Sequence, residues 1–113
     1  MYSIKEDKTL GSKLVKIDVS IKMTESAHVP DTMLLIRVLP MVAVVGQSDR
    51  VERSHATGTV LDLYIKFLPE SGTLYKNLMS LCKLIKKLPG VKHIKVERVA
   101  GRVVTYKGNP IVI

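Results

Sequence analysis

The octapeptide LIRVLPMV at residues 35–42 returns as LIKKLPGV at residues 84–91, and this repeat decides the expected fold. In both copies a Leu-Pro pair closes a stretch that can form a helix, because the residue before a proline is disfavoured in the helical region. A valine then opens an extended stretch. Upstream, an Ile-Lys pair is followed shortly by Glu-Ser in each half, within residues 21–26 and 65–71. The chain therefore consists of two tandem units, each a strand, a turn, a helix and a second strand.

Two strands are predicted from strict alternation of apolar and polar residues, over residues 15–23 and 59–67. Successive side chains of a strand point to opposite faces, so each strand has one apolar and one polar face. Residues 43–45 and 91–99 are predicted as the second strand of each unit. The polar residues 47–58 between the units predict a projecting hairpin loop.

Residues 74–88 predict the clearer helix, because Leu74, Leu78, Leu81, Ile85 and Leu88 form one apolar stripe. Residues 33–39 are apolar nearly all round and could form a helix or a strand. Asp31 as a cap and Pro40 as a stop favour a helix of about two turns.

The element order is β-α-β-β-α-β, which predicts an α+β domain of the split βαβ, or ferredoxin-like, kind. Right-handed crossovers would place both helices on one face of an antiparallel sheet. We expect residues 1–12 to form a flexible arm and residues 13–113 a single domain. After the second unit, residues 102–106 and 111–113 predict an extra C-terminal hairpin and strand. The apolar end at 111–113 either packs on its own sheet or forms an exposed edge for self-association.

The composition of the chain indicates a globular cytoplasmic protein with a basic C-terminal half. Of 113 residues, 46% are hydrophobic and 25% charged, and the net charge is +8. Residues 61–113 carry ten Lys or Arg against three acids, so this half serves a polyanion partner or acts as a solubilising surface. No apolar run or leader pattern predicts membrane insertion or export. A single cysteine, Cys82, indicates a reducing compartment.

No pattern predicts catalysis, a metal site or a cofactor. His28, His55 and His93 stand apart from one another and have no ligand at metal-binding spacing. Cys82 lies on the apolar side of its helix and is predicted to be a small core residue rather than a nucleophile. The glycines form neither a dinucleotide-binding nor a phosphate-loop pattern.

Two groups of side chains are candidates for binding. The open sheet face is expected to present Lys16, Lys22, Tyr64 and Lys66 beside Asp18, Ser20 and Asp62, with His93 and Lys95 added from an edge strand. Only Tyr64 could stack on a base there, so aromatic recognition of RNA is not expected. The second group could follow a phosphate backbone by charge alone: Lys76, Lys83 and Lys87 on the helix, then Lys95, Arg98, Arg102 and Lys107 in the last strands.

The stretch Ser71-Gly72-Thr73-Leu74 and the stretch Gly90-Val91-Lys92-His93-Ile94 resemble ACT-type regulatory domains within residues 65–99. This resemblance implies an effector site at which the backbone of Gly72 approaches a small molecule. The chain departs from the family in a longer helix and in Glu70 at the turn. Residues 35–40 and 42–47 are also similar to uncharacterised phage-encoded proteins.

We therefore expect a non-catalytic binding or assembly module that forms a homo-oligomer and contacts nucleic acid through its basic half. The alternatives are an ACT-like effector-binding domain and a structural subunit of a larger complex, such as a phage assembly.

Overall fold

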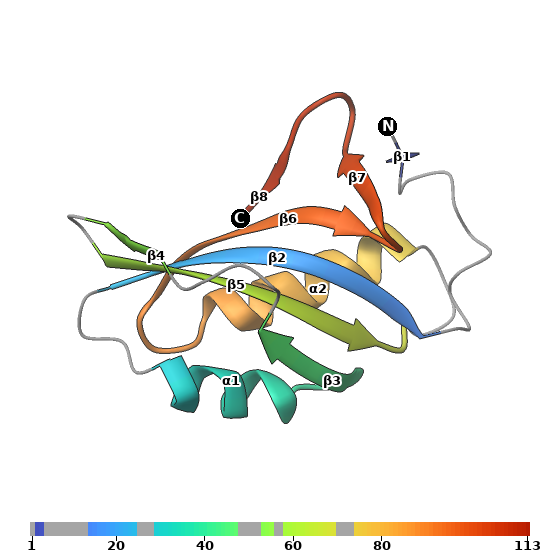
Figure 1. Ribbon diagram of the computed structural model, residues 1–113. Helices are drawn as coiled ribbons and strands as arrows, with labels where there is room; N and C mark the ends of the chain where they lie inside the picture. Colours follow the sequence, from blue (N-terminus) through green and yellow to red (C-terminus); the bar gives the residue numbers. More distant parts are fainter. Residues whose placement is uncertain (1, 4–13, 25–28, 48–52, 56–57, 70–73) are drawn as a thin grey trace.

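The computed structural model describes residues 2–3, 14–24, 29–47, 53–55, 58–69 and 74–113 (Figure 1). Its elements are β1 (Tyr2–Ser3), β2 (Val15–Met23), α1 (Val29–Arg37), β3 (Val42–Gln47), β4 (Arg53–His55), β5 (Gly58–Phe67), α2 (Leu74–Lys86), β6 (Val91–Val99), β7 (Arg102–Thr105) and β8 (Ile111–Val112).

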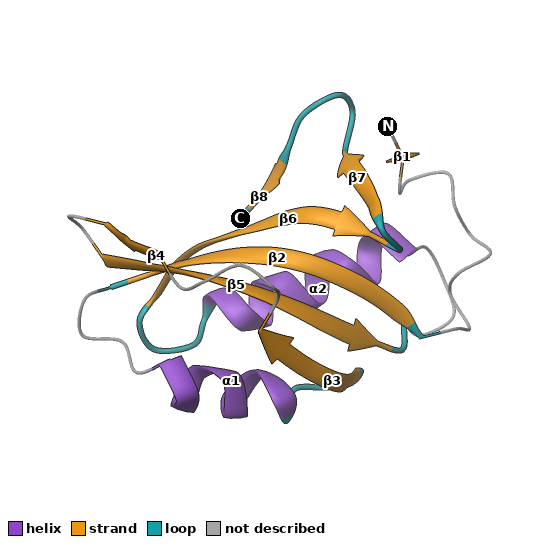
Figure 2. Cartoon of the chain, viewed as in Figure 1, coloured by secondary structure: helices purple, strands orange, loops and turns teal. Residues whose placement is uncertain are grey.

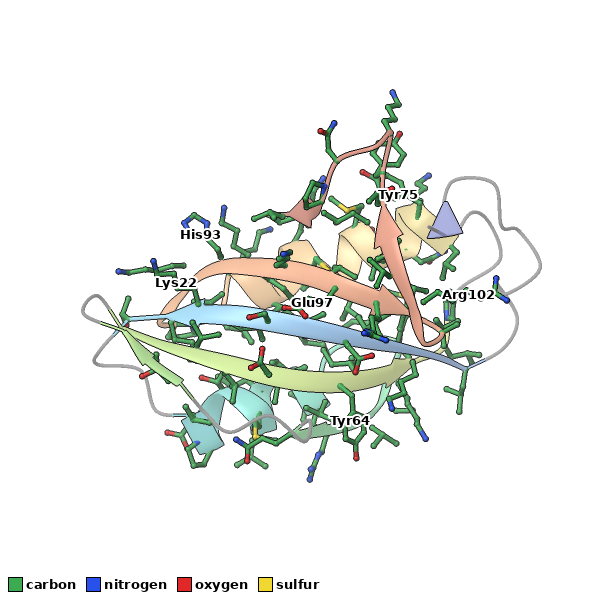
Figure 3. All side chains as sticks on the ribbon, turned by 45° about the horizontal axis from the view of Figure 1, so that its top comes forward. Lys22, Tyr64, Tyr75, His93, Glu97 and Arg102 are labelled. Carbon is green, nitrogen blue, oxygen red and sulfur yellow. The ribbon has the colours of Figure 1, made fainter. Side chains whose placement is uncertain are left out.

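One sheet runs in the order β1-β7-β6-β2-β5-β3, with β4 paired to β5 and β8 paired to β6. Every described pair is antiparallel except β1 with β7, which is parallel. The α+β class is therefore confirmed. Both helices lie on one side of the sheet, behind β2, β5 and β6 in Figure 3, and the other side of these strands is open (Figures 2 and 3).

Alternation along β2 and β5 builds the core between the sheet and the helices. The odd-numbered residues of β2 from Val15 to Met23 are at most 2% exposed. Each lies opposite an odd-numbered residue of β5, so Ile17 faces Ile65 and Ile21 faces Leu61. Paired residues lie on the same face of a sheet, so two apolar rows meet the buried stripe of α2 and Ile36 of α1.

The second helix forms close to its predicted range, but the first begins four residues earlier than expected. Pro30 lies in the first turn of α1, where its missing N–H costs nothing, so it opens the helix instead of preceding it. Asp31 is therefore a first-turn residue rather than the cap. Thr32 and Ile36 are buried one turn apart, and the helix ends at Arg37, before the Leu39-Pro40 pair.

The repeat seen in the sequence recurs in the backbone after each helix. The Leu39 N–H donates to the Ile36 carbonyl at 3.1 Å, and the Leu88 N–H donates to the Ile85 carbonyl at 3.0 Å. Two residues later the backbone of both segments adopts a left-handed conformation, with φ 73° at Met41 and 83° at Gly90. The two units therefore share one helix-to-strand connection, although only the second has the glycine that this conformation favours.

The C-terminal segment forms an arch beside β6. A turn at Ala100-Gly101 leads into β7, and a turn at Lys107-Gly108 leads back toward β8, with positive φ at all four residues. Paired positive φ values match the tight turns that suit the twist of a hairpin. The end of the chain packs on its own sheet: Ile111 is 4% exposed, and the Ile113 N–H donates to the Ile94 carbonyl at 2.9 Å.

Part of the predicted organisation lies outside the described residues. This holds for most of the expected arm 1–12, of which Tyr2–Ser3 pair with β7, and for the two Glu-Ser turns. In the expected loop 47–58, β4 pairs with the start of β5. Among the described helices, neither has the length and apolar character needed to cross a membrane.

Candidate binding surfaces

The open sheet face brings together the polar residues predicted for it. The pairing of β2 with β5 places Lys16 opposite Lys66 and Asp18 opposite Tyr64. Asp62 lies opposite Ser20, but at 4% exposed it is buried and does not belong to an accessible surface. The central part of this face therefore combines cations with acids.

The expectation that residues 91–99 form a sheet edge is wrong, because β7 and β8 pair with the outer side of β6. The strand still presents His93 and Lys95 as exposed side chains, opposite Lys22 and Ser20. Lys22 and His93 lie near one end of the sheet in Figure 3. His93 and Lys95 therefore lie next to the polar residues of β2, on a strand that has neighbours on both sides.

An irregularity in β6 brings Glu97 and Arg98 together beside Asp18. Asp18 pairs with Arg98 while Val19 pairs with Val96, so β6 has one more residue than β2 at this point. Such a bulge changes the side to which the following side chains point. The burial pattern reflects it, since Ile94, Val96 and Val99 are buried with a spacing of two and then three. Glu97 is a residue of this face that pattern reasoning missed.

Tyr64 is held in place from two directions. Gly46 on β3 lies opposite it, and a Cβ atom at Gly46 would come within 2.4 Å of the tyrosine ring. The Lys16 Nζ atom lies 5.2 Å from the ring centroid, a cation–π distance. The ring is therefore covered by protein groups, which weakens its role as a stacking platform.

The helix layer carries a separate basic surface. Lys76, Lys83 and Lys87 are exposed, as is Lys86. Steps of seven and four residues put the first three on one side of the helix, opposite the buried stripe. No Asp or Glu occurs between residues 71 and 96, a stretch that holds six lysines. The helix therefore contributes lysines and no acidic side chain to this surface.

The predicted phosphate-tracking residues therefore fall on several surfaces. Lys76 and Lys83 lie on the outside of α2 and Lys87 directly follows it, whereas Lys95 and Arg98 belong to the open sheet face on the other side of the molecule. Arg102 pairs with the buried Val99 and so lies on the helix side of β7, at the opposite end of the sheet from His93 (Figure 3). The Lys107 Nζ atom lies 5.4 Å from the ring centroid of Tyr106.

The prediction for Cys82 is confirmed, since its side chain is fully buried in the core. Burial raises the pKa of the thiol to about 12, which keeps it protonated at neutral pH. Within the described ranges, no three His, Cys, Asp or Glu residues group as metal ligands. Gly72, on which the effector site of the ACT resemblance depends, lies outside the residues that the structure describes.

Comparison with known proteins gives no relative for this chain: no family model, no curated protein and no solved structure matches it.

Proposed function

We propose that this chain is a ferredoxin-like, non-catalytic binding and assembly module whose α2 surface binds the phosphate backbone of nucleic acid. The strand order supports the fold. β2 and β3 are both antiparallel to β5, which lies between them, and β5 and β6 are both antiparallel to β2 in the same way. In a split βαβ fold, the two strands of each βαβ unit are separated in the sheet by one strand of the other unit, and the order β6-β2-β5-β3 has this property.

The observation that carries the nucleic-acid proposal is the row of exposed lysines on the outside of the helix layer. Lys76 and Lys83 lie on α2 and Lys87 directly follows it, so at 1.5 Å per residue the row extends over about 16 Å. A row of this length can contact several phosphates, and each contact releases bound counterions. The open sheet face is less suited to this role, because Asp18 and Glu97 lie among its cations.

The aromatic residues favour contact with the backbone over recognition of bases. Phe67 is buried, Tyr64 is covered by Lys16 and Gly46, and Tyr75 stacks on Tyr106 with ring centroids 3.9 Å apart. Base stacking needs an accessible ring. Among the side chains that the structure describes, none offers one freely, so binding should depend little on sequence.

Two triple variants with equal loss of charge test this proposal. Changing Lys76, Lys83 and Lys87 to Gln, or Lys16, Lys22 and Lys66 to Gln, lowers the net charge from +8 to +5 in both cases. Fluorescence anisotropy with labelled duplex DNA and RNA at several salt concentrations should show salt-dependent binding of the unmodified protein. The helix variant should bind about tenfold or more weakly. The slope of log K against the logarithm of the salt concentration should be shallower by up to about 3, because each lost lysine removes one phosphate contact.

The sheet variant should keep most of the affinity. Equal losses in both variants would mean that only the net charge matters, and absence of binding at low salt would refute the nucleic-acid proposal.

We further propose that assembly uses α1 and β3. Four apolar side chains are exposed there: Leu34 by 56% and Leu35 by 41% on α1, Val38 by 78% directly after it, and Val44 by 41% on β3. Among the described strands, β3 pairs only with β5, so its outer edge is open to a further strand. No residue of β3 is charged, and charge is the usual protection of an edge strand. A homo-oligomer that pairs these edges would cover the apolar side chains.

A further inference from the structure

A pocket of about 290 Å³ lies where the C-terminal arch leaves the sheet. β7 pairs with β6 at Arg98 and Val99, and β8 pairs with β6 at Lys95 and Val96. Between these contacts the chain departs from β6, and its turn is tied to α2 by the stack of Tyr106 on Tyr75. Figure 1 shows β7 and β8 diverging above β6. Pro110, which has no N–H to donate, precedes the pairing of β8 and lines the pocket.

The lining of the pocket is amphipathic. Val96 and Val104 are 1% and 3% exposed, and their side chains belong to the core. Because these two lining residues have almost no exposed surface, the accessible apolar surface of the pocket comes from Val103 and Pro110, which are exposed. Neighbours along a strand point to opposite faces, so Val103 and Thr105 on β7, and Lys95 on β6, lie toward the open sheet face. The pocket therefore combines exposed apolar side chains with polar and charged ones.

The residues that line the pocket carry more positive than negative charge, and Asp18, opposite Arg98 on β2, lies outside the lining. Lys95 and Arg98 are exposed, and in the described part of the chain neither has a side-chain partner. The one acid of the lining, Glu97, already interacts with another group of the protein. Two cations against one carboxylate leave the lining with a single net positive charge.

We propose that this pocket binds a small monocarboxylate with a short aliphatic body. The planar guanidinium of Arg98 can donate two parallel hydrogen bonds to a carboxylate, and Lys95 and the Thr105 hydroxyl can donate further ones. The aliphatic body would contact Val103 and Pro110, the exposed apolar residues of the lining. The volume lies at the lower end of ligand sites, which span about 300–1,000 Å³, so the ligand is small. A single net charge favours a monoanion over a phosphate dianion.

The test uses isovalerate as the probe and the full chain labelled with ¹⁵N, at constant ionic strength. Titration should move the amide signals of Val96, Val104 and Thr105 in a saturable way. Isovaleramide has the same shape without the charge and should give no saturable shift. Arg98→Gln should raise the Kd for isovalerate about tenfold or more, because it removes a charge-assisted bidentate contact.

Lys66→Gln is the matched control, since it removes one charge from the same sheet face at a residue outside the pocket. It should leave the Kd unchanged, and the amide spectrum of each variant reports whether the fold is intact. Equal binding of isovaleramide, an equal effect of Lys66→Gln, or shifts with inorganic phosphate and none with isovalerate would each overturn the proposal. These outcomes do not depend on nucleic-acid binding, which we assign to the other side of the molecule.

Discussion

At the scale of single residues, Gly46 is fixed by the ring of Tyr64. A Cβ atom at Gly46 would clash with the Cζ and Oη atoms of Tyr64, so Gly46→Ala forces the ring to move. We expect a loss of about 1–3 kcal/mol in the free energy of unfolding, as for other overpacked sites. Urea denaturation of a double-mutant cycle measures it. In a Tyr64→Ala background, Gly46→Ala should cost much less, and an undiminished cost would exclude the clash as its cause.

Cys82 gives a second prediction at this scale. Burial raises the pKa of its thiol from 9.0 to about 12, so the folded protein retains a proton that the unfolded chain loses between these values. The contribution of this group to stability is therefore intact below pH 9 and decreases as the pH rises toward 12. At pH 8 a thiol reagent should label Cys82 only on unfolding, whereas Ser80→Cys, at an exposed position of the same helix, should react at once. Rapid labelling of native Cys82 would contradict its burial.

At the scale of elements, the C-terminal arch depends on the stack between Tyr106 and Tyr75. Tyr106→Leu removes an aromatic pair worth about 0.5–1.5 kcal/mol and should speed hydrogen exchange at Asn109 and Ile113. The pKa of Tyr75 is raised by burial first and by the phenol of Tyr106 second. Tyr106→Phe keeps the ring and should lower the pKa of Tyr75 without faster exchange, which an NMR titration can follow. Unchanged exchange in Tyr106→Leu would show that the stack does not hold the arch.

Strands and helices were predictable from sequence to the extent that their patterns are local. Residues 15–23 and 61–67 alternate without interruption, so their faces were assigned correctly. The first helix was predicted to begin too late, because Pro30 was interpreted as a residue before the helix. A proline is equally compatible with the first turn of a helix, where Pro30 lies. In β6, a bulge between Val96 and Val99 moves Arg98 to the face of Asp18, and simple alternation cannot foresee this.

At the scale of the whole molecule, the sequence locates the charge but not its distribution in space. The basic half was visible, yet Lys83 and Arg98 fall on opposite sides of the sheet because one belongs to a covering helix and the other to a strand. The pocket was not predictable, since it forms between β7 and β8. Each of these strands pairs with a different part of β6, and this pairing depends on tertiary contacts rather than on a local sequence pattern. Its residues have no motif in common.

The last prediction concerns assembly through the open edge of the sheet. Antiparallel pairing of β3 with β3 of a second copy would be symmetric, as closed dimers require, and would continue the sheet across the interface. Val44→Lys puts a charge on this edge and should convert the oligomer to a monomer in light scattering coupled to size exclusion. Val112→Lys is the matched control, because Val112 is 55% exposed on β8, away from β3. It should leave the oligomer intact. A monomeric unmodified protein, or dissociation by Val112→Lys alone, would reject the β3 interface.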